Sequence, residues 1–236
     1  MEIGEIITDA IKYPMDNVKS MLIYIVLSII AALALAFTIG GVAITADNIA
    51  AAGIIGIIGF LIALVIYFLI TGYCLDIIKF GINQENNAPE IDLARQVING
   101  IKYIIVTLVY LIIPFIVMIL LNQLNETLGL IVGIILFIIF GFGLLMGVCR
   151  LAKTESLGDA LNIPEAIKDI TKVGIVKILA IIIIFIVLSI VVSLIVSLFG
   201  YLGDAGTFIG GIINGIANVF LLFFYNRAVG LAYSDI

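Results

Sequence analysis

Histidine is absent from the 236-residue sequence, and only 11% of the residues are charged. Without histidine the chain lacks the usual general base and the commonest metal ligand. Soluble domains have about 25% charged residues, so this chain cannot cover a water-exposed surface. Its hydrophobic share of 64% also excludes intrinsic disorder, and its net charge of −5 argues against nucleic-acid binding. We therefore expect a membrane protein that holds neither a metal ion nor another cofactor.

Six uncharged stretches of at least 22 residues each run through the chain. They lack the polar–apolar alternation of a lipid-facing β-barrel, so they predict helices. A helix of that length reaches about 33 Å, enough for a hydrocarbon core of about 30 Å. The sequence thus predicts one all-α integral membrane domain over residues 1–236. Its six expected transmembrane helices are 20–38, 54–75, 103–121, 128–149, 177–199 and 208–228.

The basic residues are confined to one side of these six spans. All 11 fall on the side of both termini, whereas the opposite loops carry only Asp47, Glu126 and Asp204. The positive-inside rule then predicts a multi-pass protein of the cell membrane with both termini cytoplasmic. The first outer loop is expected to be long, around 38–53, and the later two to be a few residues each. Acidic residues are mixed among the cytoplasmic basic ones, so a purely polybasic lipid site is not supported.

An internal repeat is indicated by a shift of 75 residues, which aligns the middle of the chain with its last third without gaps. The aligned identities include Gly72/Gly147, Cys74/Cys149, Asn87/Asn162, Pro89/Pro164, Glu90/Glu165 and Lys102/Lys177. An earlier copy, offset by 90, begins where Ala10–Tyr13 is similar to Gly100–Tyr103. We expect three parallel tandem hairpin repeats, at about 1–76, 77–152 and 153–236.

Each repeat is expected to begin with a cytoplasmic amphipathic interfacial helix. In the first, the charged residues recur at helical spacing and form one stripe. That stripe consists of Glu2, Glu5, Asp9 and Lys12. The second and third helices are expected to open at Asn87–Glu90 and Asn162–Glu165. There asparagine suits the N-cap, proline the first turn and glutamate a capping box.

The stretch Ile3–Pro14 resembles the opening of archaeal multi-spanning membrane proteins filed as domain of unknown function 4013. Gly72-Tyr73, Ala88–Asp92 and Asn99–Lys102 are also similar to that family. A related pattern occurs in the membrane domain of some glycerophosphodiester phosphodiesterases. The resemblance covers essentially the whole chain. It implies a polytopic membrane fold and assigns no activity, substrate or catalytic residue.

Polar residues inside the spans are the first candidates for a site. Asn214 and Asn218 lie four apart on the sixth span and so share a face. A similar stripe on the fifth span consists of Ser189, Ser193 and Ser197. These residues either form a polar intramembrane site or, as we favour, make interhelical hydrogen bonds and close packing.

No charge lies in the middle of a span, which argues against ion-coupled transport. Asp76, Arg150 and Arg227 stand at cytoplasmic helix ends. We expect their side chains to reach the aqueous interface by snorkelling.

Other features have structural interpretations. Lys168, Lys172 and Lys177 are candidate contacts to lipid headgroups. Three G-x-x-x-G pairs are expected to pack helices closely, within the chain or between subunits. These pairs are Gly129/Gly133, Gly143/Gly147 and Gly211/Gly215. Pro114 should kink the third span, and Cys74 and Cys149 are expected to be packing residues.

Motifs of nucleophilic, phosphate-binding or zinc enzymes are absent from the sequence, so we expect no enzyme. The favoured hypothesis is a non-enzymatic protein that binds lipid or organises the membrane. One alternative is a transporter or channel for a small uncharged or amphipathic solute, using Asn214 and Asn218. Another is a membrane partner subunit. The expected partners are membrane lipids, together with either a second copy or another membrane protein.

Overall fold

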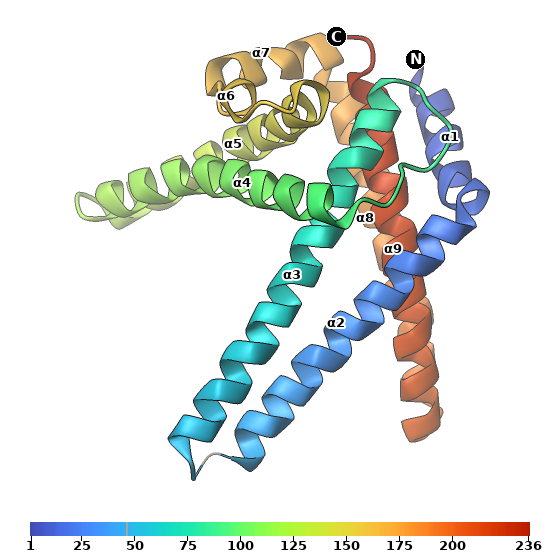
Figure 1. Cartoon of the computed structure of the whole chain (residues 1–236). Coiled ribbons are helices and arrows are strands. Elements are labelled where there is room, and N and C mark those ends of the chain that lie inside the picture. The colour runs from blue at the N-terminus through green and yellow to red at the C-terminus, as the bar shows by residue number, and fades with distance from the viewer. Residues whose placement is uncertain (46) are drawn as a thin grey trace.

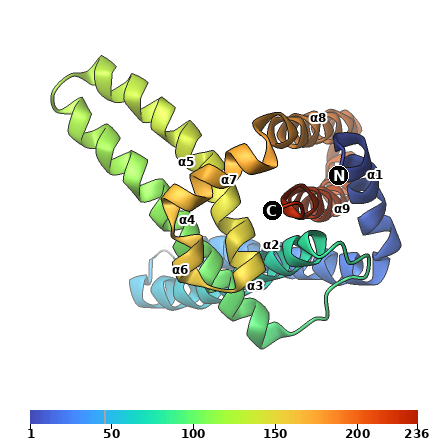
Figure 2. The ribbon, with the colours of Figure 1, turned by 90° about the horizontal axis from the view of Figure 1, so that it is seen from above.

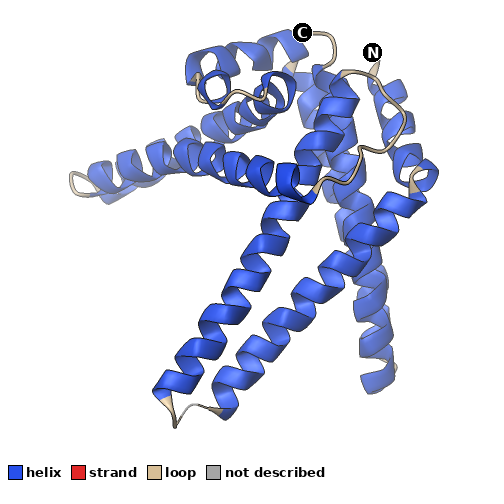
Figure 3. Ribbon diagram, in the orientation of Figure 1, coloured by secondary structure: helices blue, strands red, loops and turns tan. Residues whose placement is uncertain are grey.

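The computed structural model describes residues 1–45 and 47–236. This part of the chain is helical, with short connections and no strand (Figure 3). The helices are α1 (Ile3–Asp16), α2 (Val18–Ile44), α3 (Ile49–Ile82), α4 (Leu93–Asn122), α5 (Glu126–Thr154), α6 (Leu157–Ala160), α7 (Ile163–Val173), α8 (Ile175–Gly200) and α9 (Gly203–Tyr233). Six of them, α2, α3, α4, α5, α8 and α9, are long and apolar enough to cross a membrane. The prediction of an all-helical chain with six helices long and apolar enough to span a membrane is thus confirmed.

The six long helices extend beyond the predicted spans. Helix α3 has 34 residues and is therefore about 51 Å long, well over the thickness of a hydrocarbon core. The prediction of a long first outer loop at 38–53 is wrong. Helix α2 continues to Ile44 and α3 begins at Ile49, where the Asn48 side chain accepts a hydrogen bond from the Ala51 amide. The other two connections that the sequence places on that side are short, as predicted, at 123–125 and 201–202.

Two of the three expected short helices are present as separate elements. Helix α1 opens with a capping box between Glu2 and Glu5. Helix α7 opens at Asn162, whose side chain accepts a hydrogen bond from the Glu165 amide, with proline in the first turn. Gly174, at φ +94°, then separates α7 from α8 in a conformation that glycine adopts at little cost.

The predicted helix start at Asn87 is wrong. Helix α4 begins at Leu93, because the Asp92 carboxylate caps it by accepting from the Arg95 amide. It then runs unbroken to Asn122, with Pro114 inside it. The residues before it form a non-helical connection, since the Glu90 carbonyl accepts hydrogen bonds from the side chains of Arg95 and Gln96.

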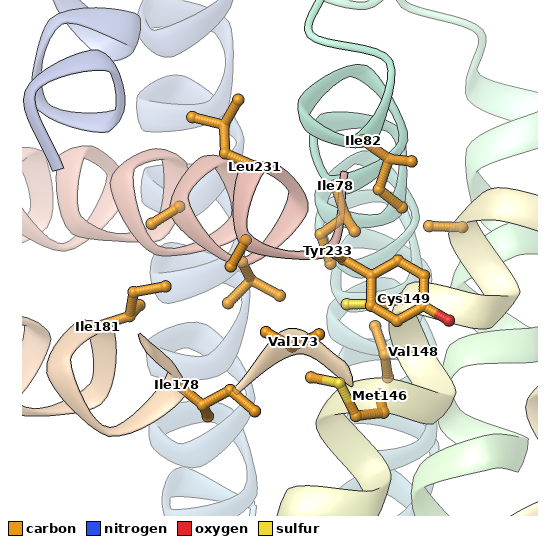
Figure 4. Close-up of a cluster of buried hydrophobic side chains, with 14 of the residues drawn as sticks. Ile78, Ile82, Met146, Val148, Cys149, Val173, Ile178, Ile181, Leu231 and Tyr233 are labelled. Carbon is orange, nitrogen blue, oxygen red and sulfur yellow. The ribbon is translucent and has the colours of Figure 1, made fainter. Parts of the chain in front are cut away.

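Three antiparallel hairpins, α2/α3, α4/α5 and α8/α9, diverge from a common base near both termini (Figures 1 and 2). The base is the region where α1, α6 and α7 pack on the ends of α3, α5 and α9. It contains the main buried core, to which Ile78, Cys149, Val173 and Tyr233 contribute (Figure 4). Away from the base, little is covered: only 11% of the most apolar window of α2 is buried. Lipid or another protein must therefore cover the hairpins.

Glycines mark the places where helix backbones meet. A Cβ on Gly72 of α3 would lie 1.8 Å from the Gln96 carbonyl oxygen of α4. A Cβ on Gly230 of α9 would lie 2.4 Å from the Ile78 carbonyl oxygen of α3. Neither backbone contact leaves space for a side chain, so these glycines fix the crossings of α3 with α4 and α9.

The three G-x-x-x-G pairs have different surroundings. Gly129/Gly133 and Gly143/Gly147 of α5 face side chains of α4, so they pack within the chain. Gly211/Gly215 of α9 face open space. The close approach of α9 to α8 is made instead by Gly206 and Gly210, against Phe199 and Val196.

Candidate functional site

Three ion pairs, which we call the charged junctions, lie in the base. Each joins the base end of α3, α5 or α9 to α4, α7 or α1, the helix that begins or precedes a hairpin. The pairs are Asp76–Arg95 at 2.6 Å, Arg150–Asp169 at 2.7 Å and Arg227–Asp9 at 2.7 Å. The first two pairs each join one hairpin to the helix that begins or precedes the next hairpin. The third joins α9, in the last hairpin, to α1, the first helix.

The junction between α3 and α4 is organised around Asp76, which is 2% exposed. Arg95 Nη1 donates to Asp76 Oδ1, and Gln96 Nε2 donates to Asp76 Oδ2 at 3.4 Å. The Tyr24 hydroxyl donates a hydrogen bond to Gln96 Oε1 at 3.0 Å. The Tyr24 ring stacks on the Tyr73 ring, with the centroids 4.1 Å apart. The carboxylate is therefore coupled to α2 as well as to α4.

The junction between α5 and α7 is organised around Asp169, which is fully buried. Its carboxylate accepts hydrogen bonds from Arg150, Lys172 and the Tyr233 hydroxyl, the last at 2.6 Å. Burial alone raises the pKa of Asp169, but the hydrogen bonds from Lys172, Tyr233 and Arg150 outweigh it. The pKa therefore lies below its ordinary value, and the carboxylate is charged.

The junction between α9 and α1 is organised around Arg227, which is 1% exposed. Its guanidinium donates to both Asp9 oxygens, to the carbonyls of Phe80 and Glu85 and to Asn86 Oδ1. The guanidinium carbon also lies 4.8 Å from the centre of the Tyr13 ring. Burial raises the pKa of the Tyr13 phenol, whose oxygen has no hydrogen-bond partner among the described residues.

The expectation of snorkelling at these helix ends is wrong. Asp76 and Arg227 are buried, and Arg150 directs its guanidinium at a buried carboxylate instead of water. Ion pairs between different helices replace hydration of the charges.

Both chain ends lie in the base as well. The Met1 amine is 2.9 Å from the Asp235 carboxylate, and Lys177 is 3.2 Å from it. The hydrogen bonds from the amine and from Lys177 hold the pKa of Asp235 below its ordinary value.

Residues 55–201 match the profile of the family described as protein of unknown function DUF4013, over more than half of the chain. The chain belongs to this family. No curated protein and no solved structure matches it. In this DUF4013 protein the matched region runs from within α3 to just past α8. It contains the junctions Asp76–Arg95 and Arg150–Asp169, whereas Asp9 and Arg227 lie outside it.

The predicted polar residues of the DUF4013 chain fall into two separate groups. On α9, the exposed Asn218 donates through Nδ2 to the carbonyl and Oδ1 of Asn214, at 2.7 and 2.9 Å. On α8, the Ser189 hydroxyl donates to the Phe185 carbonyl at 2.8 Å, and Ser193 is exposed. Within residues 1–45 and 47–236, no hydrogen bond joins the asparagines to the serines.

An open groove of about 320 Å³ lies beside Asn218, between α2, α8 and α9. It is lined by Ser28, Phe185, Gly215, Asn218, Val219, Leu221, Leu222 and Tyr225. Ser189 and Ser193 line a different groove, formed by α8 alone. Of the predicted polar residues, only Asn218 thus reaches a groove between hairpins, together with Ser28, which the sequence did not single out.

The three candidate lipid-binding lysines are all paired within the chain. Lys168 contacts Glu165 at 2.6 Å, Lys172 contacts Asp169 at 2.7 Å, and Lys177 contacts Asp235. The hydrogen bond from Lys168 holds the pKa of Glu165 below its ordinary value. Cys74 and Cys149 are free and buried, in agreement with their predicted packing role.

Arg95 and Asp169 are the main site residues that the sequence did not single out. Both lie 19 residues after their junction partner, with the charges reversed between the two pairs. That common 19-residue spacing between opposite charges is the signal by which they could have been found.

Proposed function

We propose that this multi-pass protein is a non-enzymatic component of the cell membrane that binds lipids between its hairpins and so organises the bilayer around it. The observation that carries the proposal is the divergence of the three hairpins from one buried base (Figure 1). Apolar faces that diverge in this way stay uncovered within the chain. Lipid acyl chains can cover such apolar surfaces, and no protein partner is then needed.

The proposed orientation has both termini in the cytoplasm. Its support is that both termini and the charged junctions lie together in the base, at the end of the hairpins that carries the basic residues. The turns at the opposite ends carry acidic residues only, Asp47, Glu126 and Asp204. This asymmetry favours the base as the cytoplasmic face.

We also propose that the chain consists of three tandem units with interfacial helices. Two charged junctions share a 19-residue spacing and lie 74 residues apart, one position from the 75-residue register, which supports a repeated architecture without strict equivalence of these residues. For the amphipathic character of these helices, the support is that α1 and α7 bury apolar residues against the base, such as Ile6 and Ile170, and expose charged ones, such as Glu5 and Lys168. The second unit differs, because its α4 begins in the base and continues directly into the long helix.

The alternative of a transporter for an uncharged or amphipathic solute is favoured by one observation, the groove that contains Asn218. Flux of such a solute into liposomes, lost in an Asn214→Leu/Asn218→Leu variant, would support transport. A partner subunit is the other alternative. A second protein that copurifies in fixed stoichiometry would support it.

Native mass spectrometry of the protein released gently from its own membrane tests the main proposal. We expect discrete adducts with the masses of individual lipids that survive mild activation. A bare chain, or a chain bound only to another protein, would overturn lipid binding.

A further inference from the structure

We propose that the groove between α2, α8 and α9 is a binding site for an uncharged, hydroxyl-bearing lipid. This inference rests on the proposed lipid-binding function and specifies the site and the chemical class of the ligand. The groove has three walls. Ser28 comes from α2, Phe185 from α8, and Gly215, Asn218 and Tyr225 from α9.

The size of the groove suits one lipid chain. Its volume of about 320 Å³ lies at the lower end of the range for small-molecule sites, about 300–1,000 Å³. From Gly215 to Tyr225 it follows ten residues of α9, or about 15 Å. That length is about half the thickness of a hydrocarbon core. Phe185 and Tyr225 form part of its wall, with ring centroids 4.9 Å apart.

Three residues that line the groove, Ser28, Asn218 and Tyr225, carry a polar atom with no partner among the described residues. The Ser28 hydroxyl makes no hydrogen bond there, and neither does Ser193 on the exposed face of α8, whereas Ser189 and Ser197 bond to carbonyls of their own helix. Asn218 uses its Nδ2 for Asn214, which leaves its Oδ1 as a free acceptor. Polar atoms left unpaired in hydrocarbon are costly. Hydroxyls on the ligand can satisfy such atoms, by accepting from Ser28 and by donating to Asn218 Oδ1.

The depth of these two residues selects an uncharged ligand. Ser28 is nine residues from Lys19, and Asn218 is nine residues from Arg227, so both lie about 13 Å from a charge at the base end of their helices. A phosphate headgroup at that depth would lose its hydration without a cation to pair with, because the residues that line the groove are uncharged. A neutral hydroxyl loses far less hydration energy.

Gly215 and Gly211 provide a matched pair of variants. At both positions an added Cβ would meet no neighbouring atom within 4 Å, so neither glycine is held in place by a close contact. Only Gly215 lines the groove. Leucine at 215 should fill the groove, and leucine at 211, one helical turn away, should leave it open.

The experiment uses the full chain in phosphatidylcholine vesicles that contain a photoactivatable diacylglycerol, with labelled peptides mapped by mass spectrometry. We expect label on α2 and α9. Ser28→Ala and Asn218→Leu should each reduce the labelling about fivefold, which is the loss in affinity expected when one neutral hydrogen bond is removed. Gly215→Leu should abolish the label and Gly211→Leu should retain it. Each variant is checked by gel filtration and thermal unfolding, and a Ser189→Ala/Ser193→Ala variant should label like the wild type.

The site is disproved if diacylglycerol labels other helices, or if Gly215→Leu and Gly211→Leu label equally. Equal labelling by a photoactivatable phosphatidic acid with the same chains would overturn the uncharged class. A crosslink between two copies through α9 would assign the groove to a second chain. In all these cases lipid adducts in native mass spectrometry could persist. Their complete loss would instead remove the proposed function itself.

Discussion

Arg227 and Asp9 are 218 residues apart in the chain, yet Nε of Arg227 lies 2.7 Å from the Asp9 carboxylate. Bonds from the same guanidinium to Phe80, Glu85 and Asn86 add the end of α3 and the connection that follows it to this contact. One buried cation therefore holds together three segments that are remote in sequence.

Asp9→Asn should destabilise the protein by about 1–3 kcal/mol, because it leaves a buried guanidinium without its counter-ion. The figure is below that for a fully buried pair, since the Asp9 side chain is 31% exposed. Lys12→Gln, an exposed change on the same helix, should stay within about 0.5 kcal/mol. Unfolding in detergent micelles measures both, and equal effects would contradict the role of the junction.

Protonation of Asp169 should weaken the base only in acid. Its folded pKa lies below its ordinary value, so its contribution is present above about pH 4, the unfolded pKa, and is lost as pH falls through the folded pKa. Stability should thus vary little between about pH 8 and 5 on account of this group. In the Asp169→Asn variant, the loss of stability at acidic pH should be smaller than in the wild type. The check is the unfolding midpoint against pH for both proteins, and parallel curves would contradict the assignment.

Two glycines of α9 should respond to alanine with opposite signs. At Gly230 the new Cβ meets the backbone of α3, so Gly230→Ala should cost about 1–3 kcal/mol through overpacking. At Gly211 it meets open space, so the better helix propensity of alanine should stabilise by up to about 1 kcal/mol. Thermal unfolding of the two variants compares them directly, and destabilisation at both positions would refute the prediction.

Both native thiols should resist labelling in the folded protein. Cys74 is 5% exposed and Cys149 is 0% exposed. A maleimide should react with them only after denaturation, with the two reactions rising together along an unfolding curve. Fast reaction of either thiol under native conditions would show that the base opens locally.

The low thiol background allows a test of orientation. Lys12→Cys and Asp204→Cys place exposed thiols at opposite ends of the helices. An impermeant maleimide added to intact cells should label Asp204→Cys at once and Lys12→Cys only after permeabilisation. The reverse order would invert the proposed topology.

The six long helices could be predicted because a charge-free apolar run long enough to cross a bilayer has few other structures available. The helix start at Asn162 could also be predicted, because its capping contact to the Glu165 amide involves residues only three apart. At Asn87 the same local signal failed, because Asp92 provides a competing cap and Arg95 and Gln96 hold the preceding backbone by tertiary hydrogen bonds.

The junctions could not be read from single positions. A charge at the end of an apolar run has the same appearance whether it extends to water or meets a partner far along the chain. Arg227 shows this most clearly, since its partner Asp9 lies in the first helix. The partner of a glycine pair is hidden for a related reason: Gly206/Gly210 and Gly211/Gly215 have the same spacing, and only the position of α8 decides which pair is covered within the chain.

The pairing of Asp9 with Arg227 also sets an order of events during biosynthesis. Asp9 leaves the ribosome 218 residues before Arg227, so α1 is made long before its counter-ion exists. All three hairpins must be synthesised before the junction can close. Until then, the first helix has only the membrane surface or a chaperone to shelter its apolar side, and completion of α9 is the step that converts a string of hairpins into a closed assembly.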